Sequence, residues 1–450
     1  MSSFKKDSVI ALNLGVFEKM KSFLYNILED SVLREELTGS SKNFTRDSKL
    51  NMPYLAGLIL NLLKRSLGVE LQESFGIIHN GTVSCTKSAF SQQRTKLLPA
   101  FFDGWNKVLV DNFYENYGKH VRKWKGYTLQ AVDGSTAYLF DKGDVKAYFG
   151  TQLNQYGGKP MARVMQIYDV LNNIVVLGII RPIIESEQAI MSSIVNKLPK
   201  NSLTLFDRGY PSFALMYLLL LQPDCKFLMR CTVGFNKEVK MFMNSRKSSK
   251  IIELSATDTA IVGLKIDGHD ITKDTKIKIR MVKFKLPSGI VEVLLTNLYD
   301  EKRFTIGDLK HLYGLRWGIE TAYGKQKNQQ QMEQFSGHRV ICVQQDYAAT
   351  IITANIQSLI EKQSDTFVKE KSEGRMYEYK INKNVSFGAL KHNIVKIFLT
   401  KSPKEILVIL QTLFEQNLEP VRPGRSNPRK EKSMRSKGKF QTFTNFKRAV

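Results

Sequence analysis

The sequence predicts an α/β protein with helical regions at both ends, and three features of the chain indicate this class. Residues 1–120 place apolar side chains at helical spacing, as in "MPYLAGLILNLLKRSLGVEL". Residues 127–207 alternate between strand-like and helical patterns. Residues 231–300 are rich in strand formers, and a helix is expected to start near Thr305 after them. We therefore expect a mixed-sheet core between two helical regions.

The first region contains a candidate DNA-reading element. The helical pattern breaks at "IIHNG", and a polar, basic helix follows in "SCTKSAFSQQRTKLL" with Ser84 or Thr86 as its N-cap. Its cationic side chains are Lys87, Arg94 and Lys96. Two helices joined by a short turn, the second of them basic, are typical of a helix-turn-helix. A plain surface helix of an α-bundle is the alternative.

The core region places two aspartates at the expected ends of strands. "YTLQAVDGS" alternates and reaches Asp133 before a glycine, which indicates a strand that runs into a turn. "ARVMQIYDV" and "IVVLGIIRPI" form an expected hairpin through the two asparagines between them. A helix over 186–198 follows, and then "NSLTLFDRGY" predicts a buried strand that ends at Asp207.

The stretch from 231 to 300 is an expected β-rich insertion with a hairpin turn at 287–289. The next helix starts at a capping box of Thr305 and Asp308. We expect it to continue through "YGLRWGIETAYGKQK", whose spacing places four side chains on one helical face. They are Tyr313, Arg316, Glu320 and Lys327. Arg316 and Glu320 also suit an ordinary i,i+4 ion pair, worth only a few tenths of a kcal/mol.

The charge of the chain indicates its partner class. The formal net charge is +25 and the pI is near 9.7, which is usual for proteins that neutralise phosphates. The longest apolar runs are too short to cross a bilayer, so we expect an intracellular protein that does not enter a membrane. The four cysteines show no zinc-site spacing. After a helical stretch over 361–420, residues 421–450 hold ten lysines and arginines against one glutamate, which is typical of a disordered, phosphate-binding tail.

Three carboxylates stand out by context, namely Asp133, Asp207 and Glu320. Each has an ordinary explanation as a turn former or a helical ion-pair partner. Together they are the hard oxygen ligands that two divalent cations require from separate elements. Such a site activates water on a phosphodiester and can then use the freed 3′-hydroxyl as a nucleophile.

The sequence also resembles a known family. "AVDGST", "LFDRGYPS", "FLMR" and the Y-x2-R-x3-E-x6-K run at 313–327 look like the motifs of DDE transposases of bacterial insertion sequences, in the branch called IS-four. The motifs occur in the order found in that family. The resemblance covers roughly residues 85–355, and it includes "SEQA" between the two aspartate motifs.

The resemblance implies an RNase H-like core in which Asp133, Asp207 and Glu320 are catalytic and bind two Mg²⁺ or Mn²⁺ ions. It implies that Tyr313, Arg316 and Lys327 contact DNA phosphates, and we expect further DNA contacts from Arg208, Arg230, Lys87, Arg94 and Lys96. The partners would be the inverted repeats at the transposon ends, target DNA and a second copy of the chain in a homodimer. The location would be the cytoplasm of a bacterium, at the nucleoid.

This resemblance divides the chain into six expected parts: a helical DNA-binding domain (1–120), the first part of the core (121–230), the β-rich insertion (231–300), the core segment with the signature helix (301–360), a helical C-terminal region (361–420) and a basic disordered tail (421–450). The reaction would be cleavage of DNA at the element ends and joining of the 3′-OH ends to target DNA. Two alternatives stay open: an inactive DNA-binding relic or regulator, and a plain nuclease without strand transfer.

One feature departs from the family pattern. Members that form a DNA hairpin stack a tryptophan of the β insertion on a flipped base, and this chain has no tryptophan between Trp124 and Trp317. An aromatic ring of another type can stack in its place. The candidates are Phe235, Phe242, Phe284 and Tyr299.

Overall fold

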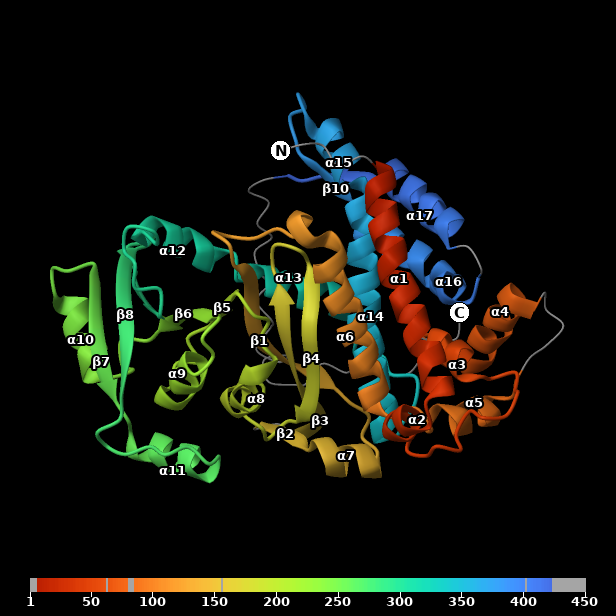
Figure 1. The fold of residues 1–450 in the computed structure, drawn as a ribbon, viewed down its shortest axis with the longest axis horizontal. Coiled ribbons are helices and arrows are strands. Elements are labelled where there is room, and N and C mark those ends of the chain that lie inside the picture. Colours follow the sequence, from red (N-terminus) through yellow and green to blue (C-terminus); the bar gives the residue numbers. More distant parts are fainter. Residues whose placement is uncertain (1–5, 62–63, 80–84, 155–156, 401–402, 423–450) are drawn as a thin grey trace.

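The computed structural model describes residues 6–61, 64–79, 85–154, 157–400 and 403–422. A long mixed sheet occupies one side and a bundle of helices the other, and the helices of the bundle come from both ends of the chain (Figure 1). Of the helices in the described ranges, none is long and apolar enough to cross a membrane.

The bundle is built around α14 (Val340–Glu361), the long helix that follows the core. α6 packs on α14, α1 packs on α6, and α3 packs on α16, so the two ends of the chain share one hydrophobic core. Trp105 of α6 illustrates this, because its ring lies 5.1 Å from that of Phe398 near the end of α16. The remaining elements of the bundle are α1 (Lys6–Glu29), α2 (Ser31–Thr38), α3 (Met52–Leu60), α4 (Leu67–His79), α5 (Lys87–Arg94), α6 (Pro99–Tyr117), η1 (Gly118–His120), η3 (Lys362–Ser364), α15 (Asp365–Ser372), β10 (Tyr379–Ile381), α16 (Lys383–Leu399), α17 (Lys404–Gln416) and β11 (Leu418–Pro420).

The structure confirms the helical N-terminal region and locates the start of the expected polar helix. α5 begins after Thr86, whose side chain accepts a hydrogen bond from the backbone N–H of Ala89 at 3.1 Å. The other cap candidate, Ser84, and most of the expected turn lie outside the described residues.

The sheet is mixed. Its order is β2-β3-β1-β5-β6-β9-β8-β7, with β4 paired to β3, and β1, β5 and β6 run parallel while the other pairs are antiparallel. The strands are β1 (Thr128–Tyr138), β2 (Thr151–Asn154), β3 (Gly157–Asp169), β4 (Ile174–Pro182), β5 (Ser202–Phe206), β6 (Cys225–Cys231), β7 (Ser249–Ser255), β8 (Lys276–Lys285) and β9 (Val291–Thr296). The hairpin predicted through the two asparagines is confirmed as β3 and β4.

Separate hydrophobic clusters cover the two faces of the sheet. Ala131 and Leu205 belong to a cluster with α12 (Ile306–Gly314), α13 (Trp317–Asn328) and α7 (Gly143–Phe149). Val132 and Phe206 belong to the opposite cluster. Its helices are α8 (Glu187–Ser193), α9 (Phe213–Leu220), α10 (Lys237–Asn244) and α11 (Asp258–Ile266), with the short η2 (Val195–Lys197) after α8. Alternate residues of a strand therefore face different helices.

Residues 231–300 are β-rich as expected, and their strands extend the central sheet rather than forming a sheet of their own. β9 pairs with β6, and β8 and β7 continue outward from it (Figure 1). The β8–β9 turn contains Gly289 at φ +86°, a backbone conformation that favours glycine. The two helices α10 and α11 in this region were not predicted.

Two local expectations were wrong. Asp133 does not end its strand, because β1 continues to Tyr138 and stays paired with β3 throughout. The expected long helix is divided into α12 and α13 by a turn at Leu315 and Arg316, where backbone N–H groups bond to carbonyls three residues back. The capping box of Thr305 and Asp308 at the start of α12 is confirmed.

The basic tail expected over 421–450 lies outside the described residues from 423 onward.

Candidate active site

The register of β1 and β5 brings the two aspartates together. The parallel pairing ends at Val132 opposite Phe206, so Asp133 and Asp207 are the next residue of each chain segment. Because side chains alternate along a strand, Asp133 points to the same face as Ala131, and Asp207 to the same face as Leu205. That is the face covered by α12 and α13.

The third carboxylate comes from α13. Glu320 lies in the first turn of this helix, where its Oε1 accepts a hydrogen bond from Arg316 Nη2 at 2.7 Å. The Arg316 guanidinium is buried, with 5% of the residue exposed, and its Nε and Nη1 have no hydrogen-bond partner in the described chain. Tyr323, on the next turn of α13, donates its hydroxyl to the backbone carbonyl of Asp133 at 3.0 Å and so fixes α13 against β1.

Asp133 is close enough to the other two carboxylates for their charges to act on it. Burial raises the pKa of Asp133 to about 7; Arg316 counteracts this shift, while Glu187, Glu320 and Asp207 reinforce it by repulsion. A carboxyl group whose pKa is raised in this way binds a proton more readily than an isolated one, and a metal cation placed beside it would relieve the same repulsion.

The oxygen-only donor set suits Mg²⁺ or Mn²⁺. The side chains do not close around an ion, however: among the described residues, no three acidic, histidine or cysteine side chains are near enough to hold a metal. The ion pair of Glu320 with Arg316 accounts for part of this, because it occupies one oxygen of the third carboxylate.

Tyr313 and Lys327, the other two residues of the signature, do not share one continuous helix, because α12 ends before α13 begins. Tyr313 is buried at the end of α12, and its hydroxyl lies 3.5 Å from Asp207 Oδ1. Lys327 donates to the carbonyl of Thr136 at 2.7 Å, which gives it a structural contact with β1.

The remaining basic residues that were expected to contact DNA lie at different places in the structure. Arg208 is exposed immediately after Asp207. Arg230 on β6 is one-third exposed and pairs with Glu292 at 2.8 Å. Lys87 is exposed on α5, and Lys96 is half-buried after it.

The structure corrects the expectation for Arg94. Its guanidinium is buried and donates to Asp346 Oδ1 at 3.0 Å, to Gln345 Oε1 at 2.8 Å and to Ser336 Oγ at 2.5 Å. These bonds attach α5 to α14, so Arg94 has a structural role and not a DNA contact.

The sequence reasoning gave no role to Glu187, the acidic residue of "SEQA". It lies in the first turn of α8, and its charge acts on Asp133. The feature of the sequence that could have indicated a role for Glu187 is its place in "SEQA", between the two aspartate motifs.

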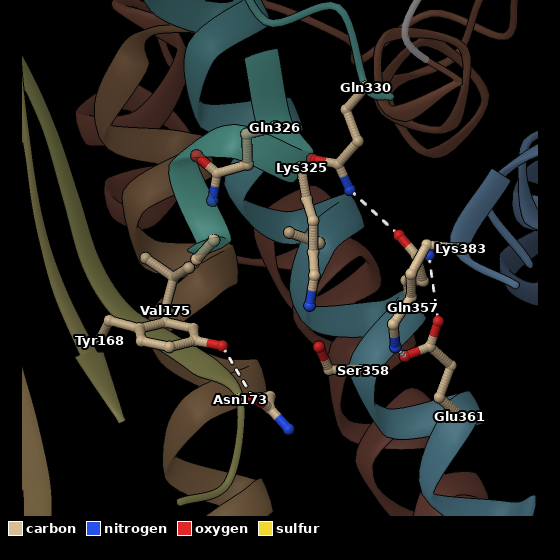
Figure 2. Close-up of a pocket in the computed structure, with 12 residues that line it drawn as sticks. Tyr168, Asn173, Val175, Lys325, Gln326, Gln330, Gln357, Ser358, Glu361 and Lys383 are labelled. Carbon is tan, nitrogen blue, oxygen red and sulfur yellow. Dashed lines mark hydrogen bonds and ion pairs between the residues drawn. The ribbon is translucent and has the colours of Figure 1, made fainter. Parts of the chain in front are cut away.

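The opposite side of α13 faces a pocket of about 50 Å³, between α13, α14 and the β3–β4 hairpin (Figure 2). Lys325 and Gln330 point toward it from α13 and the residues that follow, and Glu361 from α14 pairs with Lys383. Since the carboxylate that lines this pocket is already neutralised, the pocket is not suited to a cation.

A segment of the chain that includes this site matches a known family. The family model described as "Transposase DDE domain" matches residues 124–356, more than half of the 450 residues. InsZ of Escherichia coli (strain K12) is 28% identical over 143 residues, which are 31% of this chain and 47% of InsZ. The transposase InsG for insertion sequence element IS4, from the same strain, is 23% identical over 210 residues, 46% of each chain.

The chain thus spans about half the length of the curated relatives that it matches. Among solved structures, a piggyBac transposase synaptic complex with hairpin DNA has a TM-score of 0.42 and 12% identity over 94% of this chain and 88% of that one. The family match includes all three carboxylates and the signature residues of α12 and α13. The chain belongs to the transposase DDE domain family.

Proposed function

We propose that this protein is a transposase. It binds the terminal inverted repeats of an insertion sequence, cleaves DNA at the ends by metal-dependent phosphodiester hydrolysis, and joins the 3′-OH ends to target DNA. The observation that carries the proposal is the register of β1 and β5, which directs Asp133 and Asp207 toward the helix that bears Glu320, inside the segment that matches the DDE domain.

We propose further that the core is RNase H-like. The order β4-β3-β1-β5-β6, with an antiparallel part and a parallel part that meet at β1, supports this assignment. The six expected parts of the chain remain proposals too. The bundle core shared by residues 1–120 and 361–420 favours treating these two regions as one structural unit.

Asp133, Asp207 and Glu320 would hold Mg²⁺ or Mn²⁺, which when bound would activate a water and stabilise the leaving oxygen. Arg316 then has two tasks. In the protein alone its guanidinium neutralises Glu320. A DNA phosphate offers Arg316 a bidentate partner and releases Glu320 for the cation, so DNA binding and assembly of the site support each other.

The remaining DNA contacts are proposed on charge and exposure. Arg208, Lys87, Lys96 and Arg230 are at least partly accessible, Tyr313 lies next to Asp207, and Lys327 contacts the backbone of β1 at Thr136. One side of α5 lines a polar groove of about 540 Å³ with the segment 336–342, which suits a nucleic-acid backbone. We propose that the chain acts as a homodimer, as the family resemblance implies.

The test is incubation of the purified protein with a labelled duplex that carries the repeats flanking its gene, in Mg²⁺, Mn²⁺ or EDTA, together with a target plasmid. We expect metal-dependent nicking at the repeat boundary and a strand-transfer product, both lost in Asp133→Ala. Specific binding without cleavage under either metal would favour the DNA-binding relic. Cleavage without a strand-transfer product would favour a plain nuclease.

A further inference from the structure

A lysine without a partner points into the pocket between α13, α14 and the β3–β4 hairpin. Lys325 of α13 is half-buried, and its Nζ makes no hydrogen bond or ion pair within the described part of the chain. Figure 2 shows this side chain extending from α13 into the pocket. Burial lowers the pKa of Lys325, and repulsion from the Lys383 ammonium lowers it further. Because buried charges are usually paired, the Lys325 ammonium calls for an acceptor.

The carboxylate of this pocket is already bonded to other donors. Among the described residues that line the pocket, Glu361 alone is acidic. Its Oε2 pairs with Lys383, while its Oε1 accepts hydrogen bonds from Ser386 Oγ at 2.7 Å and from Gln357 Nε2 at 3.2 Å. The charge of Glu361 acts on Lys325 from a distance, without a bond between the two groups. One positive charge in the pocket therefore has no bonded counter-charge.

Two uncharged donors line the same pocket. They are the hydroxyl of Ser358 on α14 and the side-chain amide of Asn173 in the β3–β4 turn (Figure 2). Asn173 Oδ1 accepts a hydrogen bond from the Tyr168 hydroxyl at 2.9 Å, which fixes the orientation of the amide. Within the described residues, neither Asn173 Nδ2 nor Ser358 Oγ donates a hydrogen bond. An ammonium, a hydroxyl and an amide N–H thus line one space, and this combination of donors suits an oxyanion.

The size of the pocket suits a single phosphate group. Its volume of about 50 Å³ is several times the roughly 10–15 Å³ that one water molecule requires, so it has room for a tetrahedral oxyanion but not for a nucleobase. The pocket also contains one unpaired acceptor, because the buried Oε1 of Gln330 has no partner in the described chain. A protonated oxygen of hydrogen phosphate or a bound water would donate to it.

The surroundings of the pocket are positively charged. A neighbouring cavity of about 140 Å³ shares four lining residues with it, among them Asn173 and Ser358. This cavity adds three cations, Arg122, Lys362 and Lys380, and one carboxylate, Asp365. With Lys325, Lys383 and Glu361, the two cavities carry five cations against two carboxylates among the described residues. This excess attracts an anion to the pocket.

We propose that this pocket is a phosphate-binding site in which Lys325, Ser358 and Asn173 hold the oxygens of the phosphate group. The site lies on the side of α13 opposite the three carboxylates. It goes beyond the proposed function, because phosphate binding here does not require DNA cleavage. Two sources share this chemistry, a backbone phosphate of DNA and free inorganic phosphate.

The experiment is calorimetric titration of the full-length protein with inorganic phosphate at constant ionic strength. Lys325→Gln removes the unpaired charge, and we expect it to weaken phosphate binding by about 10-fold or more, as the loss of a charge-assisted hydrogen bond does. Ser358→Ala removes one neutral donor and should weaken binding by a smaller factor. Lys369→Gln, exposed on α15, changes the net charge equally and is the matched control, so it should bind phosphate like the wild type.

A second measurement identifies the source of the phosphate. If it is the DNA backbone, Lys325→Gln should also reduce the slope of log K against log salt for duplex DNA by about one unit, while Lys369→Gln should not. Weaker phosphate binding with an unchanged slope would identify free phosphate as the ligand.

The proposal is overturned if the wild-type protein does not bind phosphate, if Lys325→Gln and Ser358→Ala both bind it with wild-type affinity, or if Lys369→Gln loses as much affinity as Lys325→Gln. If a melting curve shows that Lys325→Gln does not fold, Ser358→Ala decides, because it removes only a hydroxyl from α14. Failure of the protein to cut or join DNA would overturn the proposed function and leave the phosphate site intact.

Discussion

At the scale of single residues, the candidate site lowers the stability of the folded protein, because it buries charged groups that are only partly compensated. Asp133 is half-buried among other carboxylates, and the ordinary pKa of an aspartate near 4 is raised to about 7. Arg316 loses most of its contact with water and satisfies only one of its three nitrogens through Glu320. Such groups are retained where a ligand completes their interactions, which is typical of functional sites.

The first prediction concerns pH in the metal-free protein. The pKa of Asp133 is higher in the folded chain than in the unfolded one, so the folded state binds more protons between pH 4 and 7 and its stability falls as pH rises through that window. In EDTA, the free energy of unfolding of Asp133→Asn should fall less between pH 5 and pH 8 than that of the wild type, by about 2 kcal/mol. Urea unfolding at both pH values measures this, and parallel pH profiles would contradict it.

The second prediction concerns Arg316. If its guanidinium binds a phosphate, Arg316→Ala should weaken DNA binding and reduce the slope of log K against log salt by about one unit. Arg316→Lys should restore the slope but not the full affinity, because an ammonium cannot bind the phosphate bidentately. Equal slopes for all three proteins would leave Arg316 with its ion pair to Glu320 as its sole role.

At the scale of elements, a buried ion pair is one of the contacts that attach α5 to the molecule. Arg94 and Asp346 lie 3.0 Å apart, and both are less than one-tenth exposed. This pair joins the candidate DNA-reading helix to α14, the central helix of the bundle. Together with the bonds of Arg94 to Gln345 and Ser336, it holds α5 against the bundle and leaves the other side of the helix exposed.

The third prediction follows from that attachment. Arg94→Ala leaves Asp346 buried without its partner, which typically costs about 3 to 5 kcal/mol of the free energy of unfolding. Guanidinium unfolding measures the loss. Lys87→Ala, on the exposed side of the same helix, should leave stability unchanged and weaken DNA binding instead. A similar stability for both variants would show that the ion pair does not secure α5.

The elements that the sequence predicted well are those specified locally. The capping box of Thr305 and Asp308 starts α12, and the asparagine turn joins β3 to β4. The features that local patterns did not predict depend on contacts between residues far apart in the sequence. β1 continues past Gly134 because β3 pairs with it there, and Glu187 meets that glycine only through the crossing of α8 over the sheet. Arg94 looked like a surface cation because its partner lies 252 residues away.

At the scale of the whole molecule, the chain has a net charge of +25, while several carboxylates lie around Asp133 in the core. If the protein is a transposase as proposed, the basic excess would attract DNA of any sequence, and the carboxylates would repel phosphate until cations neutralised them. Specific positioning of the DNA is therefore expected to depend on the helical bundle, and cleavage on the metal.

The fourth prediction separates these contributions. Residues 421–450 hold ten basic side chains against one acidic one. Deleting this segment should lower the affinity for all duplexes by a similar factor and reduce the salt slope, while the preference for the element's own repeats over random DNA stays the same. Competition binding at two salt concentrations measures both quantities. A loss confined to the repeats would show that the segment reads sequence.

We propose above all that Asp133, Asp207 and Glu320 form a metal-dependent site that cleaves DNA. The most direct test is Glu320→Gln, with DNA binding and DNA cleavage both measured on the same repeat duplex in Mn²⁺. The substitution removes one proposed metal ligand and no proposed phosphate contact. We predict that cleavage is abolished while the affinity for the duplex stays within a few-fold of the wild type, and that Glu253→Gln, exposed on β7, changes neither. Cleavage at the wild-type rate, or an equal loss of binding and cleavage, would contradict the assignment.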